Sequence, residues 1–218
     1  MVSIPKFLPA ACRCGASGFL VKIEPSVELH GLKFTRPEVV SGSIPVSAPE
    51  RTLRVATHEA SHAAIVHTLG YDLLSVTAED QPHCLRASIS CHADRAAVAL
   101  AGGHGERLVM ERREFRPYDK AVLTTFNVVR ELRMGGCDQC TAALAMFGYC
   151  GPNPGDVDLL AAYRRVEAAT IDAVREPKVR CAIRSLAGRL MSVGTVDEAE
   201  AHRIIENIGV EFGSRTII

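Results

Sequence analysis

The sequence lacks several features that would place the protein in another class. Its 25 basic and 25 acidic side chains leave no net charge, which argues against binding of nucleic acid through bulk electrostatic attraction. No apolar run approaches the roughly 20 residues that a membrane-spanning helix needs. The first residues lack the basic flank and apolar stretch of a signal peptide, and no Gly-x-x-x-x-Gly-Lys-Ser/Thr phosphate loop of an ATPase occurs. We therefore expect a cytoplasmic protein that binds neither nucleic acid nor membranes.

The composition is that of a folded domain with many thiols. At 218 residues, with 47% hydrophobic and 23% charged side chains, the chain fits one globular domain with a tail. It holds eight cysteines but lacks the short length and signal peptide typical of a secreted disulfide framework. We therefore expect these cysteines to be buried thiols, metal ligands or a redox pair.

Changes in residue pattern divide the chain into three parts. Residues 1–46 contain scattered prolines and glycines without a helical period, which predicts an irregular N-terminal segment with short strands such as Gly18–Ile23. Residues 47–210 carry regular apolar periodicity and form the predicted domain. Residues 211–218 form a C-terminal tail.

Within the predicted domain, most of the periodicity is helical. The first helix runs over about 48–69, from a capping box at 47–50 to Gly70. Two strands follow, at 73–77 and 84–92. The other helices are expected at about 93–110, 120–134, 157–175, 178–193 and 197–208, with a Cys-, Gly- and Pro-rich stretch between 135 and 155. The predicted fold class is α+β, mostly helical.

The first predicted helix carries an H-E-x-x-H motif, whose defined positions are His58, Glu59 and His62. Residues four apart project from one face of a helix, so both imidazoles can reach one Zn²⁺. Such a metal lowers the pKa of a bound water towards ~7, and Glu59 would take the proton as general base. The alternative is a helix whose histidines are merely solvated or packed in the core.

Residues 55–63, which read V-A-T-H-E-A-S-H-A, resemble the active-site helix of the FtsH-type zinc peptidases, A-x-H-E-A-G-H-A. Two later segments are similar to the same family and occur in the expected order. Residues 100–109 resemble its L-x-G-G-R-A-A-E-E-L-V helix, and residues 182–196 resemble its C-terminal helices. Ser61 stands where the family usually has glycine, and no segment of these 218 residues resembles the family's ATPase module or membrane anchor.

This resemblance implies a zinc metalloendopeptidase, a hydrolase related to the ATP-dependent peptidases but reduced to their peptidase domain. The implied fold is a zincin-like active-site helix with a small β-sheet and a C-terminal helical bundle, and the implied cofactor is Zn²⁺. The substrate would be a peptide or an unfolded protein, and the strand at 84–92 could pair with it by strand addition. Because FtsH-type peptidases are hexameric, a homo-oligomer or a separate partner chain stays open.

A catalytic zinc needs a third protein ligand, and the resemblance implies an aspartate that opens a helix after residues 100–109. Asp119 opens a predicted helix there, and the number of helices that follow favours it. Asp158 matches the family's local residues better but requires an insertion that contains a whole helix. Asp156 is a further alternative, and each of these aspartates could instead be a helix N-cap without any metal.

The cysteines provide a second candidate site. Cys137 and Cys140 form a single C-x-x-C motif. Cys12 and Cys14 could complete a four-thiolate site with them, but the sequence offers no means of bringing the two segments together. A metal site, a disulfide and ordinary thiols therefore all stay open.

Two other side chains have expected positions around the histidine pair. Glu106 could be the hydrogen-bond partner that a zinc-bound histidine usually needs. His67 falls off the face that His58 and His62 share, so we interpret it as a surface residue.

The main alternative to an enzyme is a catalytically silent, peptidase-like binding or regulatory module with structural zinc or none. A second alternative is a regulated partner protein, in which the N-terminal 46 residues bind another chain or cover the cleft. Glu59 favours catalysis, because a purely structural metal site has no use for a glutamate at this position.

Overall fold

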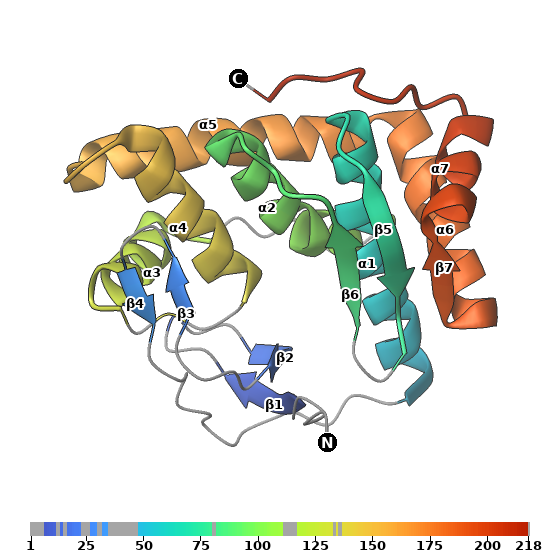
Figure 1. Cartoon of the computed structure of the whole chain (residues 1–218), viewed down its shortest axis with the longest axis horizontal. Coiled ribbons are helices and arrows are strands. Elements are labelled where there is room, and N and C mark those ends of the chain that lie inside the picture. Colours follow the sequence, from blue (N-terminus) through green and yellow to red (C-terminus); the bar gives the residue numbers. More distant parts are fainter. Residues whose placement is uncertain are drawn as a thin grey trace.

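The computed structural model describes residues 7–11, 14, 17–22, 27–29, 32–34, 48–79, 82–110, 117–132, 134 and 137–217. Over these residues the protein is mostly helical, with a small three-stranded antiparallel sheet (Figure 1). The helices are α1 (Ala48–Thr68), α2 (His92–Val109), α3 (Asp119–Arg130), α4 (Asp138–Cys150), α5 (Asp156–Arg175), α6 (Pro177–Val193) and α7 (Glu198–Asn207). The predicted α+β, mostly helical class is confirmed. No helix in this described part of the chain is both long and apolar enough to cross a membrane.

Helix α1 lies at the centre of the fold because small side chains cover much of its surface. Its alanines at positions 56, 60, 63 and 64 are completely buried. Small side chains let helix backbones approach closely, and α1 packs against α2 on one side and α6 on another. In Figure 1, α5 runs across the top of the molecule, with α3 and α4 at one side and α6 and α7 at the other.

Two apolar clusters stabilise this arrangement. One joins α1, the sheet, α6 and α7, and includes Ile65, Leu73 and Leu186. The other joins α2, α3, α4 and α5, and includes Phe126 and Met146. Because α2 contributes residues to both clusters, it fixes the position of α4 relative to α1.

The sheet has the order β6-β5-β7, with β5 (Leu73–Thr77) in the centre, β6 (His83–Arg86) at one edge and β7 (Thr195–Asp197) at the other. Both neighbours of β5 are antiparallel to it. The predicted strand at 84–92 is too long. Arg86 pairs with Leu73, which begins β5, so the chain beyond Arg86 has no partner strand in this sheet.

A helix that the sequence-based prediction did not include, α4, lies within the Cys-, Gly- and Pro-rich stretch between 135 and 155. From Asp138 to Phe147 the chain contains no glycine or proline and is rich in good helix formers such as alanine, leucine and methionine. The flanking glycines and the cysteines obscured this pattern. The omission matters for the functional site, because α4 supplies one of its carboxylates.

The N-terminal segment contains two hairpins, in which β1 (Phe7–Ala11) pairs with β2 (Ser17–Lys22) and β3 (Val27–Leu29) pairs with β4 (Leu32–Phe34). Strand β2 corresponds to the predicted strand at 18–23. The capping box proposed at 47–50 begins at Ser47, which lies outside the described residues.

The C-terminal tail packs on the end of α1, where its backbone N–H groups at Gly213 and Arg215 donate hydrogen bonds to the carbonyls of His67 and Thr68. His67 is completely buried, so its interpretation as a surface residue is wrong. Its Nε2 donates to the carbonyl of Val210, and its pKa is lowered by burial. The contacts that bury it come from chain segments far away in sequence.

A buried glutamate connects α5 to α2 and α3. Glu167 is 1% exposed, accepts a hydrogen bond from Arg164 Nη1 at 2.5 Å and lies 3.5 Å from His104 Nε2. Burial alone would raise the pKa of Glu167, but His104 and Arg164 outweigh this effect and lower it. Arg164 also binds Asp119, at the start of α3.

We expect Glu167→Gln to lower the free energy of unfolding by about 1–3 kcal/mol at neutral pH, because the buried negative charge that faces Arg164 and His104 is lost. The depressed pKa means that this contribution is present above the unfolded-state value of about 4.3 and is lost as the pH falls through the lower folded-state value. Urea unfolding of both proteins across this pH range measures the difference.

The matched control is Asp172→Asn, on the exposed side of the same helix, which should change stability by less than about 0.5 kcal/mol. A difference between wild type and Glu167→Gln that stays constant from neutral to acidic pH would contradict the assigned ionisation.

Candidate metal centre

Two histidines of α1 and one aspartate of α4 bring their ligand atoms together. His58 Nε2 lies 2.9 Å from Asp138 Oδ2, and His62 Nε2 lies 3.5 Å from the same oxygen. The two rings meet edge to face, with centroids 4.7 Å apart. One ligand atom from each residue lies within 4.8 Å of the others, so the three side chains form a group that could hold a metal ion.

The other nitrogen of each ring has its own partner, which fixes the ring orientation. His62 Nδ1 lies 2.6 Å from the carbonyl oxygen of Val98, and because a carbonyl can only accept, Nδ1 carries the proton. His58 Nδ1 lies 3.5 Å from Glu106 Oε2. Both Nε2 atoms therefore point towards Asp138 Oδ2. A neutral ring with its proton on Nδ1 has no proton on Nε2, which is the tautomer that a metal requires at this atom.

Glu106 has the position expected for a hydrogen-bond partner of a ligating histidine. Its carboxylate lies between His58 and Arg54, whose Nε donates to Glu106 Oε1 at 2.7 Å. Burial alone would raise the pKa of Glu106, but the interactions with His58 and Arg54 outweigh this and lower it. Glu106 is therefore an anion that can orient the imidazole from α2.

The electrostatics of the group favour positive charge at its centre. Burial would lower the pKa of His58, but hydrogen bonds with Asp138 and Glu106 outweigh it and hold that pKa well above its usual value. The pKa of His62 is also raised, by Asp138 against burial. The pKa of Asp138 is held far below its usual range, because the two imidazoles outweigh its own burial. A divalent cation would satisfy the same attraction.

Gly102 of α2 lies directly against the two imidazoles. A Cβ atom built on Gly102 would be 2.5 Å from Nε2 of His58 and 2.5 Å from Nε2 of His62. Real Cβ atoms do not approach ring nitrogens this closely, so only glycine fits here. A Cβ atom built on the next residue, Gly103, would meet no atom of the described residues within 4 Å outside its own helix backbone.

The serine within the motif is accommodated in a similar way. Ser61 Oγ donates to the carbonyl of Thr57 at 2.6 Å, and a Cβ on Gly105 of α2 would overlap this side chain. Because Gly105 leaves the space open, α1 and α2 can pack closely with serine at position 61.

Glu59 lies beside the histidine pair but outside the group of possible ligands. It is 8% exposed, and its pKa is raised by burial, although the neighbouring imidazoles partly oppose this. A carboxylate with a raised pKa is a better proton acceptor and donor near neutral pH than an ordinary one.

A cavity of about 320 Å³ opens over the group. Its walls come from α1, α2, the start of α4 and the edge strand β6. Besides His58, Glu59, His62 and Asp138, the lining includes Arg54, Val55, Pro82, His83, Cys84, Arg86, Val98, Ala99, Glu106, Cys137 and Thr141. The arrangement therefore combines a possible metal site, a buried carboxylate and a sheet edge in one cavity.

The structure does not bring the aspartates expected from the sequence to the histidine pair. Asp119 has a side chain that is 64% exposed and bound to Arg164 at 2.6 Å. Asp158 is exposed in the first turn of α5, and Asp156 pairs with Arg130 at 2.6 Å. Neither Asp119 nor Asp158 belongs to a possible metal group among the described residues, whereas Asp138 does.

Asp138 was missed because its helix was missed. The expected feature, an aspartate that opens a helix after the second motif, describes Asp138 as well as it describes Asp119. An uninterrupted helix-forming run after residue 137 was the available signal. Counting helices favoured Asp119 only because α4 was left out of the count.

The donors suit a transition metal. Two neutral imidazoles and one carboxylate are three of the ligands that a tetrahedral Zn²⁺ takes in catalytic sites, where a fourth position holds water or substrate. Partners that orient the ligating rings are part of such sites, and Val98 and Glu106 provide them here.

Asp138→Ala should weaken metal binding by more than about 100-fold, because it removes a ligand atom that faces both rings. Asp119→Ala is the matched control, since Asp119 is also the first residue of its helix. Metal content per chain after gel filtration distinguishes the two variants. Metal lost from Asp119→Ala but retained by Asp138→Ala would overturn the assignment.

Gly102→Ala should abolish metal binding, because the added methyl group must displace the two ring nitrogens. Gly103→Ala should retain the metal and stabilise the protein by up to about 1 kcal/mol, since alanine favours the helix and space is open. Metal titration and thermal unfolding of both variants check this. Equal metal affinity in the two variants would contradict the close approach of α2.

Comparison with known proteins does not assign the chain to a family. No family model matches the sequence, and no curated protein is significantly similar to it. The resemblance to the FtsH-type peptidases therefore stays a prediction from short motifs. Any inference about function rests on the geometry of the site itself.

Proposed function

We propose that the protein is a zinc-dependent metallopeptidase that hydrolyses peptide bonds. The observation that carries this proposal is the presence of Glu59 in the same cavity as the convergent ligand atoms of His58, His62 and Asp138. The same proposal includes the prediction that α1 is a zincin-like active-site helix. This prediction depends on the H-E-x-x-H motif binding zinc and catalysing hydrolysis.

Zinc is favoured over other metals by the combination of donors with Glu59. Two histidines and a carboxylate also occur at ferrous sites of oxygenases. A glutamate next to the first histidine, in H-E-x-x-H on a helix, is the arrangement of a general base in metalloproteases. Glu59 is buried and is not among the possible ligands, so it is available for proton transfer.

The residues of the chain would divide the reaction as follows. Zn²⁺ bound by His58, His62 and Asp138 would supply a Lewis acid that lowers the pKa of a water molecule towards ~7. Glu59 would accept a proton from this water as it attacks the peptide carbonyl carbon, and would then donate the proton to the leaving amine. Glu106 and Val98 would hold the two imidazoles in orientation throughout.

The sheet edge supports a peptide as the substrate. Among the described residues, strand β6 pairs with β5 alone, and His83, Cys84 and Arg86 of this strand line the cavity. An extended peptide could add to this edge through main-chain hydrogen bonds, which bring its carbonyl groups past Glu59. An unfolded or extended substrate suits this mode, because its backbone is free to pair.

Glu59→Gln should retain the metal but lower the rate of peptide hydrolysis by about 100-fold or more, because the amide cannot accept the proton. Cleavage of fluorescently labelled casein, together with metal content per chain, measures both quantities. Glu198→Gln, an exposed residue in the first turn of α7, is the matched control and should leave the rate unchanged.

Removal of the metal with a chelator should abolish cleavage, and stoichiometric Zn²⁺ should restore it. A protein that binds zinc at His58 and His62 but cleaves no substrate would support the alternative of a silent binding module. Full activity in Glu59→Gln would reject the proposed mechanism.

A further inference from the structure

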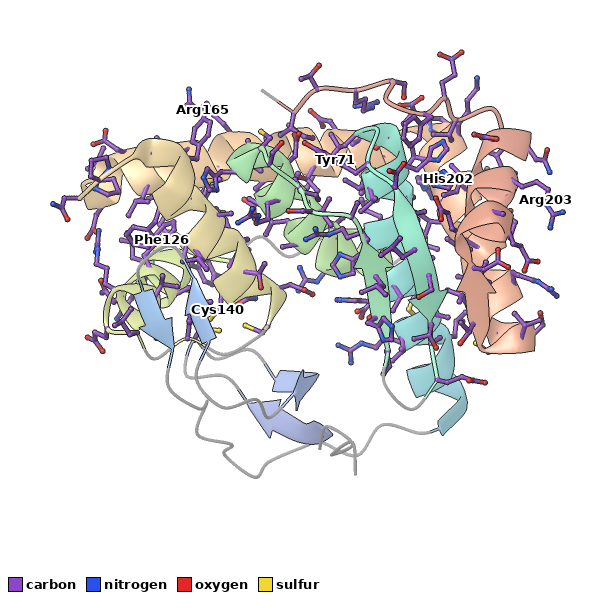
Figure 2. All side chains as sticks on the ribbon, in the orientation of Figure 1. Tyr71, Phe126, Cys140, Arg165, His202 and Arg203 are labelled. Carbon is purple, nitrogen blue, oxygen red and sulfur yellow. The ribbon has the colours of Figure 1, made fainter. Side chains whose placement is uncertain are left out.

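A group of three cysteines lies at the start of α4, close to the candidate metal centre. Cys14 Sγ lies 3.5 Å from Cys137 Sγ, and the sulfurs of Cys14, Cys137 and Cys140 all lie within 4.8 Å of one another. Cys137 and Cys140 are buried at 4% and 0% exposure, next to Val128. Figure 2 shows Cys140 at the lower end of α4, on the side where the N-terminal strands lie.

The separation of the sulfurs fits a shared metal better than a disulfide. A disulfide joins its sulfurs at about 2.05 Å. Two thiolates bound to one tetrahedral Zn²⁺ at about 2.3 Å lie about 3.8 Å apart. The observed 3.5 Å between Cys14 and Cys137 is close to the second value.

The backbone around Cys137 suits a negatively charged sulfur. Cys137 is the N-cap of α4, and its Sγ accepts a hydrogen bond from the Cys140 N–H at 3.4 Å. The N-terminus of a helix favours negative charge, and thiolates at such positions are the form that binds metal. The C-x-x-C spacing places Cys137 and Cys140 on the same turn, as zinc sites require.

The sequence supplies a fourth thiol next to Cys14. Cys14 lies in the connection between β1, which ends at Ala11, and β2, which begins at Ser17. Cys12 lies two residues earlier in the sequence and outside the described residues. The sequence thus has a C-x-C pair in this connection and a C-x-x-C pair at the start of α4.

We infer that Cys14, Cys137 and Cys140 bind a structural Zn²⁺ separate from the histidine centre. This site goes beyond the proposed peptidase activity and does not depend on it. Sites in which cysteines supply three or four of the zinc ligands are typically structural, so this metal is structural and not catalytic.

The thiolate site would have two structural effects. A two-stranded hairpin is at best marginally stable by itself in water, and a metal would join the β1–β2 hairpin to α4 across more than a hundred residues of sequence. Asp138 lies between Cys137 and Cys140 in sequence. The same metal would therefore fix the turn that presents Asp138 to His58 and His62.

Cobalt substitution tests the inference, because Co²⁺ bound by thiolates gives a sulfur-to-metal charge-transfer absorption that histidine and carboxylate ligands do not give. The full chain, purified under reducing conditions and stripped of metal, is titrated with Co²⁺. Wild type should bind about two ions per chain and show the thiolate absorption. Cys137→Ser and Cys14→Ser should each lose that absorption.

Two further variants make the result specific. Cys181→Ser, an exposed cysteine of α6, is the matched control and should keep the absorption and both ions. His58→Ala should keep the thiolate absorption and bind about one ion fewer, because only the histidine centre is disrupted. Cys14→Ser serves as the second test if the buried Cys137→Ser variant does not fold.

Several outcomes would overturn the inference. These are an absence of thiolate absorption in wild type, its persistence in both Cys14→Ser and Cys137→Ser, or a disulfide among these cysteines in the purified protein. The proposed peptidase would survive each of them, provided that His58→Ala still loses one ion. Conversely, wild type could show the thiolate absorption while His58→Ala binds as many ions per chain as wild type. This result would support the cysteine site and reject the histidine centre.

Discussion

The candidate site depends on how closely α2 approaches α1. At Gly102 the backbone of α2 lies against the Nε2 atoms of both His58 and His62, and a single methyl group would not fit. Buried alanines on α1 permit the same closeness along the rest of the helix pair. Since α2 also packs on α4, this contact determines where Asp138 meets the two imidazoles. Packing and site geometry are thus set by the same small residues.

Charge is organised around the histidine pair in layers. Asp138 faces the Nε2 atoms, while Glu106 faces Nδ1 of His58 and is itself paired with Arg54. The neighbouring carboxylates favour the protonated form of each imidazole, which raises the pKa values of both histidines. A metal would replace those protons, so metal binding and histidine ionisation are linked. Glu59 is buried and is not among the possible ligands. Under the proposed function it is therefore available to accept and donate a proton beside the metal.

The start of α4 connects the histidine centre with the N-terminal segment. Its first residue is Asp138, and the residue before it is Cys137, whose sulfur meets Cys14 of the β1–β2 connection. If the inferred thiolate zinc is present, the N-terminal hairpin would stabilise the position of a ligand instead of only covering the cleft. A segment that covers the cleft and a segment that supports Asp138 therefore predict opposite effects on activity when it is removed.

Local periodicity in the sequence determined most of the helices, including the one that carries His58, Glu59 and His62, because a helix repeat fixes which residues share a face. It failed for α4, where nearby glycines obscured a helix-forming run, and for β6, whose length depends on the extent of β5. Tertiary structure alone decided that Asp138 replaces Asp119 at the histidines, that His67 is buried, and that Cys14 meets Cys137. These contacts join segments far apart in the chain, and residue spacing carries no information about which distant faces pack together.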